Sequence, residues 1–217
     1  MSSIRCRETP MKQQQTPASD VAFTPTVKHV QQRKGSRAAY ARREADGGFD
    51  TVITPELAEF IAGQRSFFLA TANAAGQPYI QHRGGPPGFL KVVDARTLGF
   101  VDFKGNRQFI TQGNLSDNPS AFLFMIDFAT RRRIKLWGTA RVVEDDTALL
   151  RRLMPPDYRA RAEQVILFTV TAWDENCPQH IPRRFEAEIV AREIDERDRR
   201  IAKLEAELGA ARRQRCT

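Results

Sequence analysis

Residues 101–114 combine residue types that could bind a phosphate group. Apolar residues at 98–103 are typical of a buried strand, and Gly105 permits a sharp turn after it. Asn106 is a favourable N-cap, so we expect a helix of about two turns that Gly113 ends. The free N–H groups at such a helix start, with cationic side chains beside them, favour an anion.

Flavin mononucleotide (FMN) is the anion that the neighbouring side chains suggest. FMN needs donors for its phosphate, a flat wall for its ring system and donors near the pyrimidine edge. The predicted phosphate ligands are Lys104, Gly105, Asn106, Arg107 and Gln108. The predicted ring contacts are His82, Arg83, Gly84 and Phe103, and Arg133 and Lys135 point from a later strand. The alternative is an ordinary strand-to-helix turn with solvated charges.

Composition indicates a globular chain with one core plus appendages, since 41% of the 217 residues are hydrophobic. The net charge of +8 lies mostly in residues 1–43, which hold nine basic and two acidic residues. Residues 44–185 hold 17 basic and 16 acidic residues, so this part is nearly neutral. A nucleic-acid groove is therefore not expected. Binding of the basic segment to a nucleic acid or a membrane surface is a further alternative.

Several functional classes lack their sequence signals. No apolar run approaches the roughly 20 residues that span a bilayer, and no secretory signal precedes residue 30, so we expect a cytoplasmic protein without membrane contact. The cysteines Cys6, Cys177 and Cys216 are too widely spaced to indicate a disulfide framework. Cys177 and His180 lack further ligands for a tetrahedral site, so no metal is predicted.

Seven segments have the composition of strands: 66–72, 77–82, 89–93, 98–103, 121–126, 134–142 and 164–173. Short helices are predicted after the N-caps Thr54 and Asp146. Most of the strands follow one another as antiparallel hairpins. The sequence therefore predicts a mainly β fold with α-helices (α+β), a six- to seven-stranded antiparallel split β-barrel.

The chain divides by composition into three parts. Residues 1–45 form a basic, partly disordered arm, residues 46–185 the barrel domain, and residues 186–217 a long charged helix. In that helix a heptad pattern connects Ala187, Val190, Ile194, Arg197, Ile201, Leu204 and Leu208. Because a charged Arg197 occupies a core position, packing along the barrel or projection into solvent are alternatives to a coiled coil.

Four motifs resemble the pyridoxamine 5′-phosphate oxidase family of FMN-binding split barrels. They are Gly76-Gln-Pro-Tyr79, Phe89-Leu-Lys-Val-Val-Asp94, Gly99-Phe-Val-Asp-Phe-Lys-Gly-Asn-Arg-Gln108 and Asp117-Asn-Pro119. The similarity covers residues 54–180. It implies FMN as the cofactor, with contacts from Lys91, from residues 106–108 and from Arg133. It also implies a homodimer that holds FMN at the subunit interface.

The chain departs from the family pattern at three places. Gln108 stands where a lysine is usual, and the segment 84–88 replaces a strand that carries an arginine, a role Arg83 could take. The ending at 173–181 resembles a branch of general FMN-binding proteins rather than the oxidase proper. Within this ending we interpret Asn176, Gln179 and His180 either as a lid or substrate contact or as a structural turn.

These observations predict a flavin-dependent oxidoreductase that acts on an unidentified small substrate, with NAD(P)H as a candidate electron donor. No general acid or base is identified. The alternative is a non-enzymatic protein that binds, stores or senses flavin, haem or deazaflavin.

Overall fold

The computed structural model describes residues 16–215 of the chain. These residues divide into two compact units, one made of 16–125 with 134–176 and the other of 126–133 with 177–215. Residues 1–15, for which disorder is predicted, lie outside the described residues, and so do Cys6 and Cys216.

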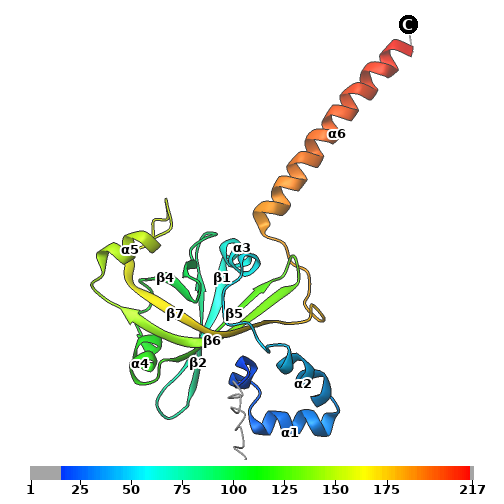
Figure 1. Cartoon of the computed structure of the whole chain (residues 1–217). Coiled ribbons are helices and arrows are strands. Elements are labelled where there is room, and N and C mark those ends of the chain that lie inside the picture. The colour runs from blue at the N-terminus through cyan, green and yellow to red at the C-terminus, as the bar shows by residue number, and fades with distance from the viewer. Residues whose placement is uncertain (1–15, 216–217) are drawn as a thin grey trace, which may run out of the picture. The chain divides into compact units, whose positions relative to one another are not determined.

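Seven strands form one sheet in the order β2-β1-β5-β6-β7-β4-β3 (Figure 1). Their bounds are β1 Ser66–Ala72, β2 Pro78–Gly84, β3 Lys91–Asp94, β4 Thr97–Phe103, β5 Ser120–Asp127, β6 Arg132–Val143 and β7 Ala162–Glu175. Strand β1 pairs antiparallel with β2 and β5, and β7 pairs antiparallel with β4 and β6. The predicted mainly β fold with an antiparallel split barrel is confirmed.

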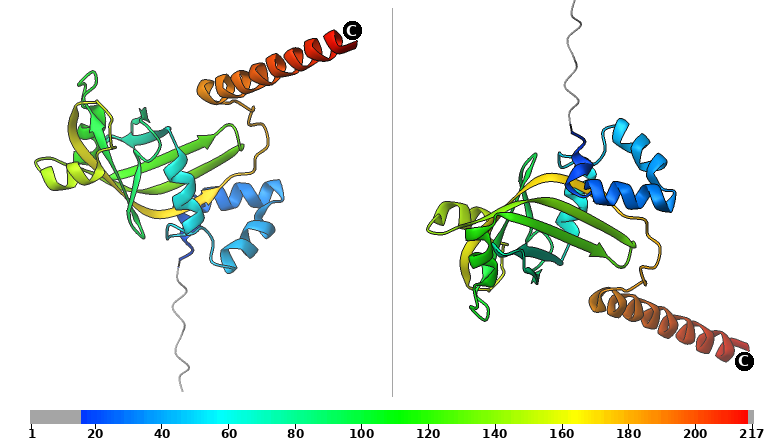
Figure 2. Two further views of the ribbon diagram at one scale, coloured as in Figure 1. Left: turned by 90° about the horizontal axis from the view of Figure 1, so that it is seen from above. Right: turned by 90° about the horizontal axis from the view of Figure 1, so that it is seen from below.

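The main core lies on the concave side of the curled sheet (Figure 2). Strands β1 and β5 bury alternate residues, whereas β4 and β7 bury consecutive ones, because a second apolar cluster with α5 packs on their other face. On β6 the predicted alternation is confirmed, since Ile134, Leu136 and Ala140 are buried. Phe67, Phe100 and Phe168 come from three other strands and are also buried in this core. Apolar burial on one face therefore fixes the register of the strands.

Two short helices begin at the predicted caps. Helix α3 (Pro55–Gly63) starts after Thr54, whose hydroxyl accepts a hydrogen bond from the Leu57 N–H at 3.2 Å. Helix α5 (Thr147–Leu153) starts after Asp146, whose carboxylate accepts a hydrogen bond from the Leu149 N–H at 2.8 Å. Each helix places apolar residues on the sheet. Helix α3 buries Leu57, Phe60 and Ile61, and α5 buries Leu153.

The turn between β3 and β4 is closed by a carboxylate. The Arg96 N–H donates to Asp94 at 2.8 Å, and this bond lowers the pKa of the Asp94 carboxyl. The Arg96 guanidinium donates to the Thr51 carbonyl at 3.0 Å, so the turn is also tied to the segment before α3.

The predicted helix after Asn106 begins later than expected. Helix α4 spans Ile110–Asp117, so Gly113 lies inside it rather than at its end. The Asn106 side chain accepts from the Gln108 N–H at 3.3 Å and forms a local turn instead of a helix cap. Arg107 and Phe109 have φ of 57° and 54°, and these left-handed residues prevent a helix before residue 110.

The segment before α3 contains three short helices that sequence reasoning did not predict. They are η1 (Ala18–Val21), α1 (Pro25–Lys34) and α2 (Arg37–Ala45). The Phe23 ring packs edge-on against Tyr40 and Phe49, and Phe49 stacks on Trp137 of β6 at 5.2 Å between ring centroids. In the described residues the segment thus packs on its own sheet, although we expected a solvated arm over a partner subunit.

The second unit contains helix α6 (Ala187–Arg215), which confirms the predicted long C-terminal helix. Within this unit the Arg184 guanidinium lies 4.7 Å from the centre of the Phe128 ring. Among the helices of the described chain, none is both long and apolar enough to cross a membrane.

Gly138 provides a test of the packing between β6 and β7. A Cβ at this position would lie 2.1 Å from the Thr169 carbonyl oxygen and 2.9 Å from the Phe168 ring. We expect Gly138→Ala to lower the free energy of unfolding by about 1–3 kcal/mol, measured by urea denaturation. Gly63→Ala is the control, because its Cβ meets nothing within 4 Å. Equal stability of the two variants would contradict this packing.

Candidate functional site

A cavity of about 50 Å³ opens to solvent between β2, β4, β7, α4 and the loop before α4. The predicted residues that line it are Arg83, Phe103, Gly105, Asn106, Arg107 and Gln108. The remaining lining residues are Tyr79, Gln81, Asp102, Phe109, Ile110, Thr111, Gln112, Glu163 and Gln164. Six of the predicted site residues therefore meet around one cavity.

Arg83 is the most buried cation in this cavity. Its side chain is 14% exposed, and its guanidinium lies 3.4 Å from the carboxylate of Asp102, itself 15% exposed. The Gln164 side-chain amide donates to the other carboxylate oxygen at 3.1 Å. Burial of two charges is tolerated because each has a partner. The Nε of Arg83 is buried without a hydrogen-bond partner and remains available as a donor.

A chain of side-chain hydrogen bonds connects Arg83 to α4. The guanidinium donates to the Thr111 hydroxyl at 3.4 Å, and this hydroxyl donates to the Gln81 side-chain oxygen at 3.2 Å. The Tyr79 hydroxyl donates to the same oxygen at 3.2 Å. Thr111 is 4% exposed, so the chain fixes the start of α4 against β2.

The loop between β4 and α4 carries exposed cations. The Arg107 Nε lies 3.3 Å from the Glu163 carboxylate, and the guanidinium lies 5.4 Å from the centre of the Phe109 ring. Lys104 and Arg107 also line a neighbouring cavity of about 200 Å³. Helix α4 has no side-chain cap at Phe109, and its first residues Ile110, Thr111 and Gln112 line the cavity. An anion would find backbone donors and cations together here.

A second cavity of about 150 Å³ contains the predicted ring contacts His82, Arg83, Gly84 and Phe103. Its other lining residues are Phe89, Phe100, Val101 and Asp102. The His82 ring packs edge-on against Phe68 at 5.7 Å between centroids. The two cavities share Arg83, Asp102 and Phe103, so they adjoin one another.

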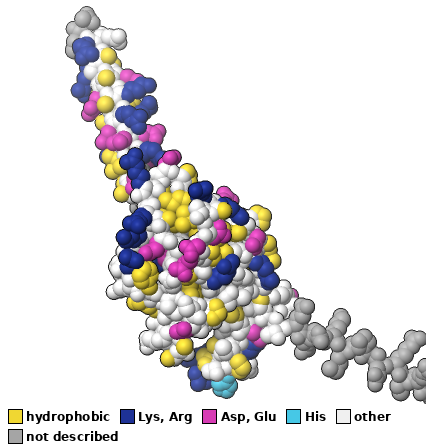
Figure 3. Space-filling view, turned by 90° about the vertical axis from the view of Figure 1, so that its left-hand side faces the viewer, with side chains coloured by type: hydrophobic (Ala, Val, Ile, Leu, Met, Phe, Trp, Pro, Cys, Tyr) yellow, Lys and Arg dark blue, Asp and Glu magenta, His cyan; other side chains and the backbone are white. Residues whose placement is uncertain are grey.

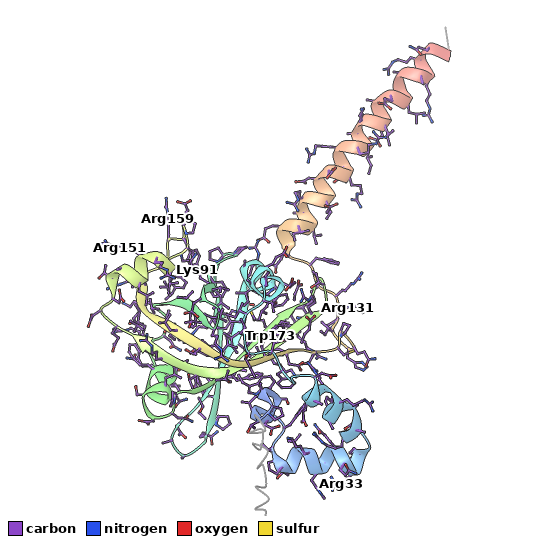
Figure 4. The ribbon with its side chains drawn as sticks, in the orientation of Figure 1. Arg33, Lys91, Arg131, Arg151, Arg159 and Trp173 are labelled. Carbon is purple, nitrogen blue, oxygen red and sulfur yellow. The ribbon has the colours of Figure 1, made fainter. Side chains whose placement is uncertain are left out.

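Lys135 and Lys91 lie in different surroundings. The Lys135 ammonium pairs with the buried Asp174 carboxylate at 2.9 Å and lies 5.3 Å from the centre of the Trp137 ring. Arg43 of α2 pairs with the same carboxylate. Lys91 is half-buried on the edge strand β3 (Figure 4). Lys135 is therefore part of a buried ion cluster that ties α2 to the sheet.

One predicted lid residue, Gln179, contacts Arg133 through its backbone carbonyl. The Arg133 guanidinium donates to the carbonyls of Cys177 and Gln179 at 3.1 and 3.5 Å, all within the second unit. His180 has a φ of 62°, so the loop turns sharply there. Asn176 is the last residue of the first unit. In this structure Arg133 holds the loop backbone, and the predicted flavin contact and lid remain predictions.

The two tryptophans belong to the wall of the fold, as their packing shows. Trp137 stacks on Phe49, and the indole N–H of Trp173 donates to the Val52 carbonyl at 2.9 Å. The surface over the sheet mixes acidic and basic side chains (Figure 3). Across residues 16–215 there is no group of three or more His, Cys, Asp or Glu side chains placed to hold a metal ion.

The polar residues of the first cavity that escaped the sequence analysis include Gln81, Asp102, Thr111 and Gln164. Asp102 offered a signal, because a carboxylate in an otherwise apolar strand needs a partner. The other three offered none, since their contacts join positions 28 to 62 residues apart.

A family model described as pyridoxamine 5′-phosphate oxidase matches residues 53–207, which include both cavities. The chain belongs to the pyridoxamine 5′-phosphate oxidase family. The predicted resemblance is confirmed. Among curated proteins no sequence relative is found.

Three solved structures to which this chain is similar carry different functional descriptions. HupZ of Group A Streptococcus is 20% identical, with a TM-score of 0.46, over 61% of this chain and 99% of that one. A putative pyridoxamine 5′-phosphate oxidase of Lactobacillus delbrueckii is 18% identical, with a TM-score of 0.45, over 58% and 95%. An FMN-binding protein of Syntrophomonas wolfei is 10% identical, with a TM-score of 0.45, over 67% and 97%.

Replacement of Lys135 distinguishes a structural from a cofactor-binding role. Because Asp174 is buried and would lose one of its two cationic partners, we expect Lys135→Met to cost about 1–3 kcal/mol in urea denaturation. Its FMN affinity should equal that of the wild type. The control Lys104→Met removes an exposed cation and should change stability by less than about 0.5 kcal/mol. A stable Lys135→Met variant that no longer binds FMN would place Lys135 at the cofactor.

Proposed function

We propose that the protein binds FMN as a homodimer, with FMN at the subunit interface, and uses it as an oxidoreductase on a small substrate. The observation that carries the proposal is the convergence of Arg83, the loop at residues 105–108 and the start of α4 on one cavity. Membership of the pyridoxamine 5′-phosphate oxidase family supports it.

The first cavity suits the phosphate end of FMN. A phosphate dianion would take donors from the α4 N-terminus, from Arg107 and from the unpartnered Nε of Arg83. Arg107 forms an exposed pair with Glu163, whereas Asp102 holds the buried guanidinium of Arg83 in place. This pre-orientation reduces the side-chain entropy that binding would otherwise cost.

The second cavity suits part of the ring system. It shares Arg83, Asp102 and Phe103 with the first, and its lining is completed by His82, Gly84, Phe89, Phe100 and Val101. At about 150 Å³ it is smaller than the roughly 300 Å³ expected for a complete small-molecule site. We infer that a second subunit supplies the remaining wall, as the homodimer proposal requires.

The flavin would supply the redox chemistry, and the protein would supply position and electrostatics. Arg83 would orient the cofactor, and Phe103, which lines both cavities, would provide a flat wall for the ring. No side chain is proposed as a general acid or base.

Absorbance spectroscopy tests cofactor and reaction in sequence. We expect the purified protein, or the protein after addition of FMN, to show flavin bands shifted from those of free FMN. Anaerobic titration with NADPH and with NADH should then bleach these bands. A protein that ignores added FMN contradicts the cofactor proposal. Bound FMN that neither nucleotide reduces would instead favour a non-enzymatic flavin-binding protein.

Arg107 tests the position of the phosphate. Arg107→Asn removes the charge while keeping a residue that tolerates the left-handed backbone at φ 57°. Loss of a charge-assisted contact of about 1.5–3 kcal/mol should weaken FMN binding tenfold or more. Riboflavin, which lacks the phosphate, should bind both proteins equally. Arg151→Asn on α5, outside both cavities, is the matched control (Figure 4). Equal loss for FMN and riboflavin would show that Arg107 does not contact the phosphate.

A further inference from the structure

Helix α6 exposes a continuous apolar stripe. Val190, Ile194, Ile201, Leu204 and Leu208 are each 41–52% exposed, although side chains of this size are usually buried in a folded protein. The helix spans 29 residues. Most helices owe their stability to an apolar face that packs against another element. The described residues of its own unit provide no such packing for the stripe of α6.

The stripe has the spacing of a two-stranded coiled-coil seam. The a positions are Ala187, Ile194, Ile201 and Leu208, and the d positions are Val190, Arg197, Leu204 and Ala211. β-Branched residues at two central a positions and leucine at a central d position favour a parallel dimer. Charged side chains flank the stripe on both sides (Figure 3).

The flanking charges are complementary to a second copy of the same helix. In a parallel, in-register pair, Arg200 at g faces Glu205 at e of the other copy. Glu207 at g likewise faces Arg212 at e. The twofold symmetry of the pair repeats each of these attractions.

The charged residue in the seam is accommodated by the same arrangement. Arg197 at d would lie beside Asp198 of the other copy. Glu193 at g faces the same Asp198, and the two arginines of this layer offset that like-charge contact. This cluster offers acidic partners to both arginines. An antiparallel pair would instead set Arg197 against an a position, and all four a residues are apolar. A single polar layer of this kind fixes register and strand number.

We propose that α6 forms a parallel, in-register, two-stranded coiled coil with α6 of a second copy of this chain. The proposal does not depend on flavin binding. The complementary charges at positions 200, 205, 207 and 212 and the acidic groups around Arg197 identify a second copy of α6 as the partner of the stripe. A coil that links two protomers would also raise their effective concentration for any other contact between them.

Disulfide trapping in the full-length protein tests the proposal. In a background with Cys6, Cys177 and Cys216 replaced by Ser, Leu204→Cys places a thiol in the seam, and Ala206→Cys places one on the opposite face. Parallel pairing brings the two copies of residue 204 within disulfide reach. Under mild oxidation we expect roughly fivefold or more cross-linked dimer from Leu204→Cys than from Ala206→Cys. Equal cross-linking of the two variants would overturn the coiled coil.

Charge reversal tests the orientation. In the Leu204→Cys chain, Arg200→Glu should lower the cross-linked fraction, because it faces Glu205 of the second copy with a like charge. Adding Glu205→Arg to the same chain should restore cross-linking, since the pair is then reversed but attractive. Failure of the double variant to recover would overturn the parallel register. Far-UV circular dichroism of each variant verifies that α6 remains helical.

Discussion

The buried contact between Arg83 and Asp102 is the constraint on which the candidate site depends. Two opposite charges are withdrawn from water at the ends of β2 and β4, and each would be costly without its partner. Gln164 of β7 satisfies the carboxylate, and Thr111 of α4 accepts from the guanidinium. Three strands and one helix must therefore keep a fixed separation for these contacts to form. The cavity is the space that this separation leaves.

The same constraint explains why the cations of the site differ in burial. Arg83 is held by the network, so it provides a fixed donor at the inner end of the cavity. Arg107 is 57% exposed and pairs only with Glu163 at the surface, where an ion pair contributes little. An entering anion would readily displace Glu163 from Arg107. At Arg83 it would bind beside Asp102, because that ion pair is buried and stays intact. The inner arginine therefore defines position, and the outer one contributes mainly charge.

The sequence predicted elements whose pattern is local and missed contacts that join distant positions. Strand β1 was predicted at its observed bounds because residues with high strand propensity are consecutive there and a turn follows. The predicted start of α4 was wrong because the Asn106 side chain accepts a hydrogen bond within its own turn. Sequence alone does not distinguish that bond from a helix cap. The network around Arg83 could not be predicted, because Gln164 approaches Asp102 only when β4 pairs with β7.

The N-terminal segment shows how charge counting misleads when partners lie elsewhere in the chain. Its basic residues suggested a solvated arm, yet Lys28 pairs with Asp20 at 2.6 Å, Arg37 with Glu44 and Arg43 with the buried Asp174. Two of these three acids lie beyond residue 43, so a count over residues 1–43 omits them. Three of the nine basic residues in 1–43 are thus paired with acidic residues of the same chain. A nucleic acid or an anionic membrane would meet fewer free cations than the sequence suggests, which favours a structural role for this segment.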